Sequence, residues 1–524
     1  MPSPRICAVI GRTRHRMVLA EMEEAAARGA DLAEIRLDFI SQAPDLKRFL
    51  AAKKHLELIA TARRPADGGR FGGSEAARKI LLRQCIADGF DWVDLETDIA
   101  DEIRRFKNVK RIVSYHNMKT VPDDLEDIYA KMCAQDADVI KIAVMGKTLP
   151  DNKRLIDLVR NAPKPTIAFC MGEIGIPSRL IGAAMGAPFI YAAFNKERII
   201  TPGMPTYTDA KSSYRLERVQ PGAQIFAVVG DPIGHSFSPL VHNAAFAKLG
   251  INALYIPIWV PKGHLAECLK VFRGIVDGYS VTIPHKEAAA HEANARDDAV
   301  VETHSANTLV RIYAPGEDPG GTVFDPTTTQ SRHLGFKAYN TDAKALMDAL
   351  VANLPRDANG APPDLHKWPV LILGAGGLAR TAAHALAKVH CTLWIASRTH
   401  ERAEKLAKEV GGEPLDWKAR HKEGCRIVIN CTPIGMHPNV DESPLHNSYL
   451  RPDLIVFESV YVPETTLLVK EARARGATVI TGVDMFIRQA STQFELFTGR
   501  EAPVDTIAKA IRRKLSPVQL PADE

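Results

Sequence analysis

The sequence predicts an α/β protein of two halves, a closed (β/α)8 barrel followed by an open α/β part. Two observations carry this prediction. The first 200 or so residues alternate eight short apolar runs with helix-like stretches, which is the rhythm of a barrel. Beyond a polar, turn-rich break, a second alternation contains a glycine-rich turn between an apolar run and a helix, which is typical of an open, mostly parallel sheet.

Length and composition exclude several classes of protein. The 524 residues allow two to four domains, at about 150 residues for each. The chain has 67 Lys and Arg against 62 Asp and Glu, a net charge of +5, and no run of like charges. A nucleic-acid surface normally needs a clustered basic stripe. With 46% hydrophobic and 25% charged residues, the chain is predicted to be a globular protein that binds no nucleic acid.

The cysteines and the uncharged stretches predict a cytoplasmic protein. All eight cysteines stand singly, with no CxxC pair, so we expect reduced thiols and neither a metal site nor a disulfide framework. The longest uncharged stretch, residues 180–194, contains Gly and Pro and is too short to span a membrane. Residues 1–15 run almost at once into an apolar strand, which leaves no room for a signal peptide.

The eight apolar runs of the first half are the predicted barrel strands. They fall at residues 6–11, 32–39, 56–63, 92–97, 111–116, 138–144, 166–172 and 189–194. Eight such units in so short a chain favour a small closed barrel, although the pattern alone leaves an open doubly wound sheet as the alternative. The alternation stops between Pro202 and Gly222, so we predict a barrel domain over residues 1–210.

A lysine in the sixth predicted strand points to chemistry. Lys141 stands in the apolar run VIKIAV, and a closed barrel has no edge from which its ammonium could reach water. Burial and cationic neighbours favour the neutral amine, which attacks carbonyl carbons. Glu34, Arg36, Arg63 and His116 also fall at strand ends, where barrels carry their active sites. We predict a Schiff-base site with a histidine proton shuttle; a Lys141 that points outward between helices is the alternative.

Five segments around these residues follow one another in barrel-compatible order. They are EIRLD (34–38), TARRPADGG (61–69), SYHN (114–117), IKIAVM (140–145) and GIPSRLIG (175–182). Together they resemble type I 3-dehydroquinate dehydratase over nearly all of residues 5–208. The resemblance implies that Lys141 forms an imine with the substrate ketone and that His116 moves protons.

The same resemblance implies roles for five other side chains. Asp67 stands where the family has a glutamate that pairs with the catalytic histidine. Arg179 would hold the substrate carboxylate through a bidentate contact. Glu34, Arg36 and Arg63 would bind the hydroxyls and neighbouring charges of the substrate.

The second half contains a candidate dinucleotide site. The apolar run at 370–373 leads into a glycine-rich turn and a helix, where backbone amides meet a pyrophosphate. The turn consists of Gly374, Ala375, Gly376, Gly377, Leu378 and Ala379. The next strand ends in Ser397, Arg398 and Thr399, so a cation stands where an NAD enzyme has an acid. The residues predict NADP(H); an ordinary strand-to-helix turn is the alternative.

Further segments surround this turn. They are GDPIGHSFSPLVHN (230–243), VTIPHKE (281–287), SANT (305–308), YNTD (339–342), GVDMFIRQA (482–490) and FELFTG (494–499). In this order they resemble shikimate dehydrogenase over roughly residues 224–515. The resemblance implies a substrate-binding domain over residues 222–350 and 484–515 and a Rossmann-like NADP domain over residues 366–483.

The second resemblance also implies a set of site residues. Lys286 and Asp342 would be the catalytic pair at the carbonyl that receives hydride. Ser236 and Ser238 would bind the substrate carboxylate. The ring hydroxyls and the pocket wall would be met by Thr282, Asn307, Gln489 and Tyr461.

The two implied activities are consecutive, which predicts a bifunctional enzyme of the shikimate pathway. 3-Dehydroquinate would be dehydrated to 3-dehydroshikimate, which the second half would reduce to shikimate. Two alternatives stay open. Asp67, and Met204 in place of a family glutamine, allow a weakly active or noncatalytic barrel attached to an active dehydrogenase. The dehydrogenase could also prefer quinate to shikimate.

Overall fold

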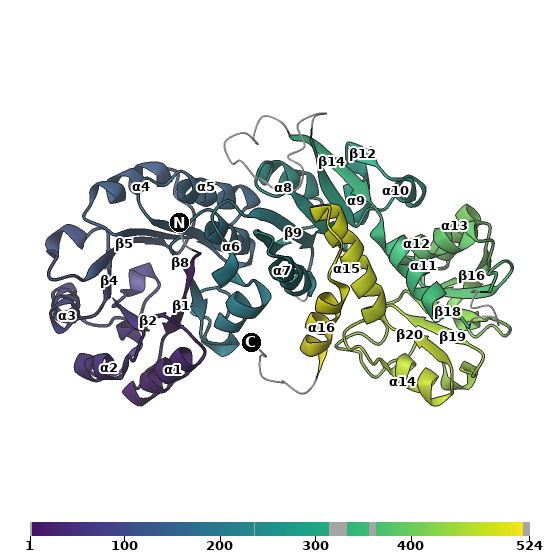
Figure 1. The fold of residues 1–524 in the computed structure, drawn as a ribbon, viewed down its shortest axis with the longest axis horizontal. Helices are drawn as coiled ribbons and strands as arrows, with labels where there is room; N and C mark the ends of the chain where they lie inside the picture. Colours follow the sequence, from purple (N-terminus) through teal and green to yellow (C-terminus); the bar gives the residue numbers. More distant parts are fainter. Residues whose placement is uncertain (1–2, 235, 314–332, 356–362, 517–524) are drawn as a thin grey trace. The chain divides into compact units, whose positions relative to one another are not determined.

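The computed structural model describes residues 3–234, 236–313, 333–355 and 363–516 (Figure 1). The described chain divides into two compact units, the first ending at Asp277 and the second beginning at Gly278. The predicted α/β class is confirmed, with a barrel first and a Rossmann-like sheet in the second unit. None of the described helices combines the length and the hydropathy of a membrane span.

The first unit opens with a near-closed sheet of eight strands. Its order is β7-β6-β5-β4-β3-β2-β1-β8, and the paired neighbours run parallel. The strands are β1 (Arg5–Ile10), β2 (Leu32–Arg36), β3 (Glu57–Thr61), β4 (Trp92–Glu96), β5 (Lys110–Asn117), β6 (Val139–Met145), β7 (Thr166–Met171) and β8 (Phe189–Ala193). Each strand overlaps one predicted run, because a strand that is covered on both faces consists mostly of consecutive apolar residues.

Helices cover the outside of this barrel (Figure 1). They are α1 (His15–Ala27), α2 (Leu46–Ala52), α3 (Glu75–Asp88), α4 (Leu125–Ala134), α5 (Leu149–Arg160) and α6 (Ile176–Ala184). Side-chain caps mark some of their starts; Ser74, for example, accepts a hydrogen bond from the Ala77 amide at the start of α3. The first unit continues with two parallel strands and two helices, β9 (Gln224–Gly230), α7 (Ser238–Leu249), β10 (Ala253–Trp259) and α8 (Leu265–Val271).

The second unit begins with four neighbouring strands of a mixed sheet. Its strands follow the order β11-β13-β14-β12, with antiparallel pairs except between β14 and β12. They are β11 (Gly278–Val281), β13 (Thr308–Tyr313), β14 (His333–Tyr339) and β12 (Ala295–Arg296). The helices beside them in the chain are α9 (Lys286–Glu292), α10 (Asp298–Thr303) and α11 (Thr341–Asn353).

A six-stranded parallel sheet follows, in the order β17-β16-β15-β18-β19-β20. Its strands are β15 (Pro369–Leu373), β16 (Thr392–Ser397), β17 (Glu413–Asp416), β18 (Ile427–Asn430), β19 (Ile455–Glu458) and β20 (Thr478–Ile480). Its helices are α12 (Gly377–Lys388), α13 (His400–Val410) and α14 (Leu467–Ala474), and α15 (Gly482–Thr498) and α16 (Val504–Leu515) end the described chain. The strand numbers fall from β17 at one edge to β15, and on the other side of β15 they rise from β18 to β20, so the chain crosses over the sheet between β17 and β18. In open parallel sheets, dinucleotides bind at such a crossover point, which here lies between β15 and β18.

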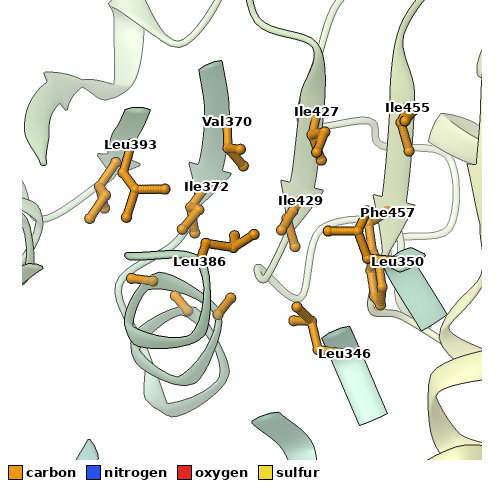
Figure 2. Packing of buried hydrophobic residues seen from close by; sticks show 14 of the residues in the cluster. Leu346, Leu350, Val370, Ile372, Leu386, Leu393, Ile427, Ile429, Ile455 and Phe457 are labelled. Atoms are coloured by element: carbon orange, nitrogen blue, oxygen red, sulfur yellow. The ribbon is translucent and has the colours of Figure 1, made fainter. Parts of the chain in front are cut away.

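Aliphatic side chains hold the helices against this sheet (Figure 2). Ile372 and Ile429, on neighbouring strands, belong to one buried cluster with Leu386 of α12 and with Leu346 and Leu350 of α11. Helix α11 begins at Thr341, inside the segment YNTD, so this packing ties the segment to the sheet that carries the glycine-rich turn. The core thereby positions two parts of one candidate site.

Candidate active sites

Lys141 of β6 lies inside the barrel and is only 5% exposed. Its Nζ lies 2.9 Å from Asp94 Oδ2 and 3.6 Å from Glu34 Oε1. The same ammonium stands 4.0 Å from the ring centroid of Tyr191 on β8. Parallel strands bring these groups together, because side chains of β2, β4, β6 and β8 that point inward meet along the barrel axis.

The Asp94 carboxylate is shared between cations. It accepts hydrogen bonds from Lys141 Nζ and, at 2.6 Å, from Ser114 Oγ, and it pairs with Arg63 Nη2 at 2.7 Å. Burial by itself raises the pKa of Asp94, but the charges of Arg63 and Lys141 hold it well below its usual range. Arg63 also pairs with Glu96 Oε1 at 2.6 Å. Asp94 is therefore an ionised carboxylate inside the barrel.

His116 of β5 is neutral in this setting. Burial, followed by the charges of Arg63 and Lys141, holds the pKa of His116 well below its usual range. Its Nδ1 is buried and has no hydrogen-bond partner among the described residues. Asp67 is bound elsewhere: its Oδ2 accepts a hydrogen bond of 2.5 Å from Arg64 Nε. Within the described chain, no hydrogen bond joins Asp67 to His116, because the shorter acid reaches the neighbouring guanidinium.

Arg179 and Arg36 are both buried but differ in their partners. Arg179 of α6 donates to Thr201 Oγ1 at 3.1 Å and lies 3.9 Å over the Phe169 ring, while its Nε finds no partner in the described chain. Burial lowers the pKa of Arg179 to about 9. Arg36, by contrast, makes two hydrogen bonds to Asp38, at 2.9 and 2.8 Å. Arg179 is thus the guanidinium that is left to receive an anion.

Asp94, Glu96 and Ser114 were not predicted as site residues, although they surround Lys141 and Arg63. A signal was present: Asp94 and Glu96 interrupt the apolar run WVDLE as Lys141 interrupts its own strand. Charged residues at alternate positions of a buried strand share one face, and that face is the barrel interior.

In the second unit, Lys286 and Asp342 form an ion pair of 2.6 Å. Lys286 begins α9 and Asp342 lies in the first turn of α11. Asn307 fixes the start of α11, because its Oδ1 accepts from the Thr341 amide at 2.9 Å and its Nδ2 donates to Thr341 Oγ1 at 2.9 Å. The structure therefore brings together three of the residues that the sequence singles out.

Gln493 of α15 was not predicted, yet it connects this region. Its Nε2 donates to the Asn307 carbonyl at 3.0 Å and to Thr308 Oγ1 at 2.8 Å, and its Oε1 accepts from Ser280 Oγ at 2.7 Å. The predicted Gln489 lies one helical turn earlier on the same helix and is half-buried. Gln493 is fully buried and aligns α15 with the Asn307 loop.

The other predicted substrate residues are less constrained. Thr282 follows β11 and is half-buried. Tyr461 packs its ring 5.4 Å from that of Phe486, and burial raises its pKa. Ser236 and Ser238 lie in the first unit, where their hydroxyls are 3.2 Å apart.

The glycine-rich turn requires glycine at position 374 and leaves space beside its other two glycines. Gly374 has a φ of +110°, and a Cβ at this position would stand 3.0 Å from the Cys431 carbonyl oxygen. A side chain at Gly376 would meet nothing within 4 Å, and Gly377, at the first position of α12, lies beside Lys286, whose Cδ would be 3.9 Å from an added Cβ. The turn thus leaves an open space at the amino end of α12, next to the Lys286–Asp342 pair, where backbone amides can meet phosphate.

The predicted phosphate-binding residues follow β16. Ser397 ends the strand and Thr399 precedes α13, with its amide 3.3 Å from Ser397 Oγ. Arg398 between them is exposed and has no carboxylate partner in the described part of the chain. Its guanidinium is available to an anion.

Glu458 at the end of β19 organises the same edge of the sheet. It is fully buried and accepts hydrogen bonds of 2.9 Å each from Asn430 Nδ2, the Val460 amide and Thr466 Oγ1. Burial raises the pKa of Glu458 to about 7. It fastens the segments after β18 and β19 to one another.

Models of four known families match the chain. Type I 3-dehydroquinase matches residues 6–221, and the shikimate dehydrogenase substrate binding domain matches residues 228–309. Shikimate / quinate 5-dehydrogenase matches residues 357–435, and the shikimate 5'-dehydrogenase C-terminal domain matches residues 482–512. The order of the matches is the order of the two halves.

Three curated relatives extend this result. The chloroplastic bifunctional 3-dehydroquinate dehydratase/shikimate dehydrogenase of Arabidopsis thaliana is 32% identical over 95% of this chain and 82% of its own. The shikimate biosynthesis protein AroDE of Chlamydia pneumoniae is 29% identical over 89% and 90%, and the NADP(+) shikimate dehydrogenase of Moorella thermoacetica is 35% identical over 57% and 96%. The chain therefore belongs to the family of bifunctional 3-dehydroquinate dehydratase/shikimate dehydrogenases, in which a lyase and an NADP-dependent oxidoreductase share one polypeptide.

Proposed function

We propose that the barrel dehydrates 3-dehydroquinate through an imine on Lys141, and that the second half reduces the product with Lys286 and Asp342 as its proton-transfer pair. The observation that carries the proposal is the position of Lys141, whose ammonium is buried between carboxylates inside the barrel. A lysine in this position has a chemical use that a surface lysine lacks.

In the dehydratase, the neutral His116 is the group that can accept a proton from Lys141. The freed amine then attacks the ketone, and water leaves as the imine forms. The protonated imine withdraws electrons from the adjacent carbon, so that carbon loses a proton and the neighbouring hydroxyl leaves as water. Arg179, which lacks a carboxylate partner in the described chain, holds the substrate carboxylate. Glu34, Arg36 and Arg63 orient the substrate, and hydrolysis of the product imine restores Lys141.

Asp67 enters this scheme as a partner for His116 once it leaves Arg64. For this exchange Arg64 must release Asp67 and keep only its ion pair with Asp98, which has a length of 2.7 Å. The Asp67 role thus depends on a rearrangement when substrate binds.

In the dehydrogenase, the bound cofactor supplies the hydride. Lys286, held by Asp342 at 2.6 Å, donates the proton to the carbonyl oxygen that becomes the new hydroxyl. Asn307, Thr282, Gln489 and Tyr461 contact the ring of the substrate.

NADP(H) fits the residues at the edge of the six-stranded sheet. The turn from Gly374 to Ala379 receives the pyrophosphate on the amides that begin α12. The exposed guanidinium of Arg398, with Ser397 and Thr399, binds the 2′-phosphate. An acidic residue at this position would repel that phosphate.

A single coupled assay tests the bifunctional assignment. The full chain is incubated with 3-dehydroquinate, the conjugated enone of 3-dehydroshikimate is followed by its absorbance, and NADPH is then added. We expect the enone to form and then to be consumed together with NADPH. If no enone forms while added 3-dehydroshikimate is reduced, the barrel is the noncatalytic module of the alternative hypothesis. Quinate and shikimate, offered separately with NADP⁺, decide between the two substrates of the dehydrogenase.

Replacing Arg398 with Ala should change cofactor preference. Loss of a charge-assisted contact of about 1.5–3 kcal/mol corresponds to a rise of roughly 10- to 150-fold in the KM for NADPH, with little change for NADH. Steady-state kinetics with both cofactors measure the difference. Arg402→Ala, one turn into α13 and also exposed, is the matched control. Equal losses for both cofactors in Arg398→Ala contradict the proposed 2′-phosphate contact.

We also propose the domain boundaries that the sequence predicts, a cytoplasmic location, and small-molecule substrates as the partners of the protein. The eight cysteines are free thiols, and burial raises the pKa of seven of them, at positions 7, 85, 170, 268, 391, 425 and 431. Buried thiols of this kind suit a reducing compartment.

A further inference from the structure

Arg78 of α3 is a fully buried arginine, 0% exposed, that stands outside the proposed catalytic set. Its guanidinium donates to the Ala62 carbonyl at 3.2 Å, pairs with Glu75 at 2.5 Å and forms a short ion pair with Glu96 Oε2. Taking a guanidinium out of water is unfavourable unless carboxylates and hydrogen bonds compensate for the lost hydration. The burial of Arg78 therefore needs an explanation, and its ion pair with Glu96 indicates one.

Glu96 joins Arg78 to the imine site through a row of alternating charges. Its second oxygen binds Arg63 at 2.6 Å, Arg63 binds Asp94 at 2.7 Å, and Asp94 binds Lys141 at 2.9 Å. Glu96 and Asp94 each lie between two cations. Arg63 in turn lies between the two carboxylates, so a change at one end of the row alters the interactions at the other.

Lys141 is faced by titratable and charged groups from five strands and from the segment after β3. Glu34 and Asp94 stabilise its ammonium, and so does the face of the Tyr191 ring. The remaining groups are Cys7 of β1, Arg63 after β3 and His116 of β5, and the charge of Arg36 of β2 acts on His116. Asp94 is the acceptor closest to Lys141 Nζ. The strength of the Arg63–Asp94 ion pair therefore influences how strongly Asp94 binds the Lys141 ammonium.

We propose that Arg78 is a positioning residue of the dehydratase. Arg78 shares the Glu96 carboxylate with Arg63, so Arg63 remains free to bind Asp94 as well. Arg63 and Lys141 then compete for the Asp94 carboxylate. Without Arg78, Glu96 has Arg63 as its remaining ion-pair partner in the described chain and draws it away from Asp94. Asp94 then binds the Lys141 ammonium more tightly. The loss of one positive charge acts in the same direction, so both effects delay formation of the neutral amine as pH rises.

The test is the pH–rate profile of dehydration in the full-length Arg78→Met variant. The acidic limb, on which Lys141 must lose its proton, should move to higher pH by about 0.5 to 1 unit, the size of shift that a nearby charge produces. The pH dependence of borohydride trapping on Lys141 should move equally. Dehydrogenase activity, measured on the same sample, gives the amount of folded chain. An unchanged acidic limb overturns the proposal, even if the variant is less stable.

Glu75→Gln is the matched control. Glu75 contacts the same guanidinium from a side chain that is 41% exposed, but it does not lie on the row toward Lys141. It should leave the acidic limb in place, and a shift equal to that of Arg78→Met contradicts the relay through Glu96.

Arg78→Lys retains the charge but lacks the planar fork that joins two carboxylates and a carbonyl. It should produce a smaller shift in the same direction. If Arg78→Met does not fold, Arg78→Lys decides: a shift supports the proposal and an unmoved limb overturns it. The proposal rests on Lys141 as the imine lysine. If the wild type is not trapped, that assignment fails; if it is trapped but no Arg78 variant moves the limb, only the role of Arg78 fails.

Discussion

Lys141→Met should abolish dehydration of 3-dehydroquinate while the chain continues to reduce 3-dehydroshikimate. The amine is the proposed nucleophile, and removal of a covalent catalyst lowers kcat on the order of 10⁴- to 10⁶-fold. Methionine has nearly the length of lysine and removes the charge. It leaves Asp94 with Arg63 and Ser114, so the barrel keeps a compensated interior. Enone formation and NADPH consumption, measured separately, report the two activities.

Borohydride trapping identifies the lysine directly. The wild type, incubated with substrate and reductant, should gain the mass of one reduced adduct on the peptide that contains Lys141. Lys147→Met, which removes an exposed lysine two residues beyond β6, should retain both the adduct and the activity. An adduct that persists in Lys141→Met contradicts the assignment.

Lys286→Met should have the converse effect. Loss of the group that donates a proton to the carbonyl lowers kcat for reduction on the order of 10²- to 10⁴-fold. Dehydration should be unchanged, because Lys286 lies in the second unit and the barrel in the first. Asp342→Asn should reduce the rate as well, since it removes the partner that holds Lys286 at 2.6 Å.

Lys344→Met is the control for this experiment, because Lys344 is an exposed neighbour of Asp342 on the same helix. It should leave both activities intact. If Lys286→Met loses dehydration together with reduction, circular dichroism distinguishes unfolding from a real dependence of one half on the other. Full reduction activity in a folded Lys286→Met excludes Lys286 as the proton donor.

Strands were the most predictable part of the fold. Each of the eight barrel strands overlaps a predicted run, because parallel strands that are buried on both faces consist mostly of apolar residues. Their ends were less predictable: the run 32–39 becomes β2, which stops at Arg36, followed by a 3-10 turn at Leu37–Phe39. Apolar character specifies that a segment is buried, whereas the end of a strand depends on hydrogen bonds to its neighbours.

Candidate site residues can be singled out from the sequence where they lie close together in the chain or interrupt an apolar strand. Lys141 and the Gly374 turn belong to this group. Asp94, Glu96 and Gln493 were not predicted, although Asp94 and Glu96 break an apolar run in the same way. The predicted pair of Asp67 and His116 is not formed in this structure, since Arg64 lies closer to the carboxylate. Such choices between competing partners depend on distances of a few ångströms.

By itself the sequence determined the α/β class, the order of the two halves and the residue types of both candidate sites, because periodicity, glycine turns and isolated charges are local properties of the chain. Only the tertiary structure decided which charges are neighbours. Arg78 and Glu34 stand at opposite ends of one row of charges that runs through Glu96, Arg63, Asp94 and Lys141. The reason is physical: electrostatic coupling depends on separation in space and on burial, and closure of the barrel sets both.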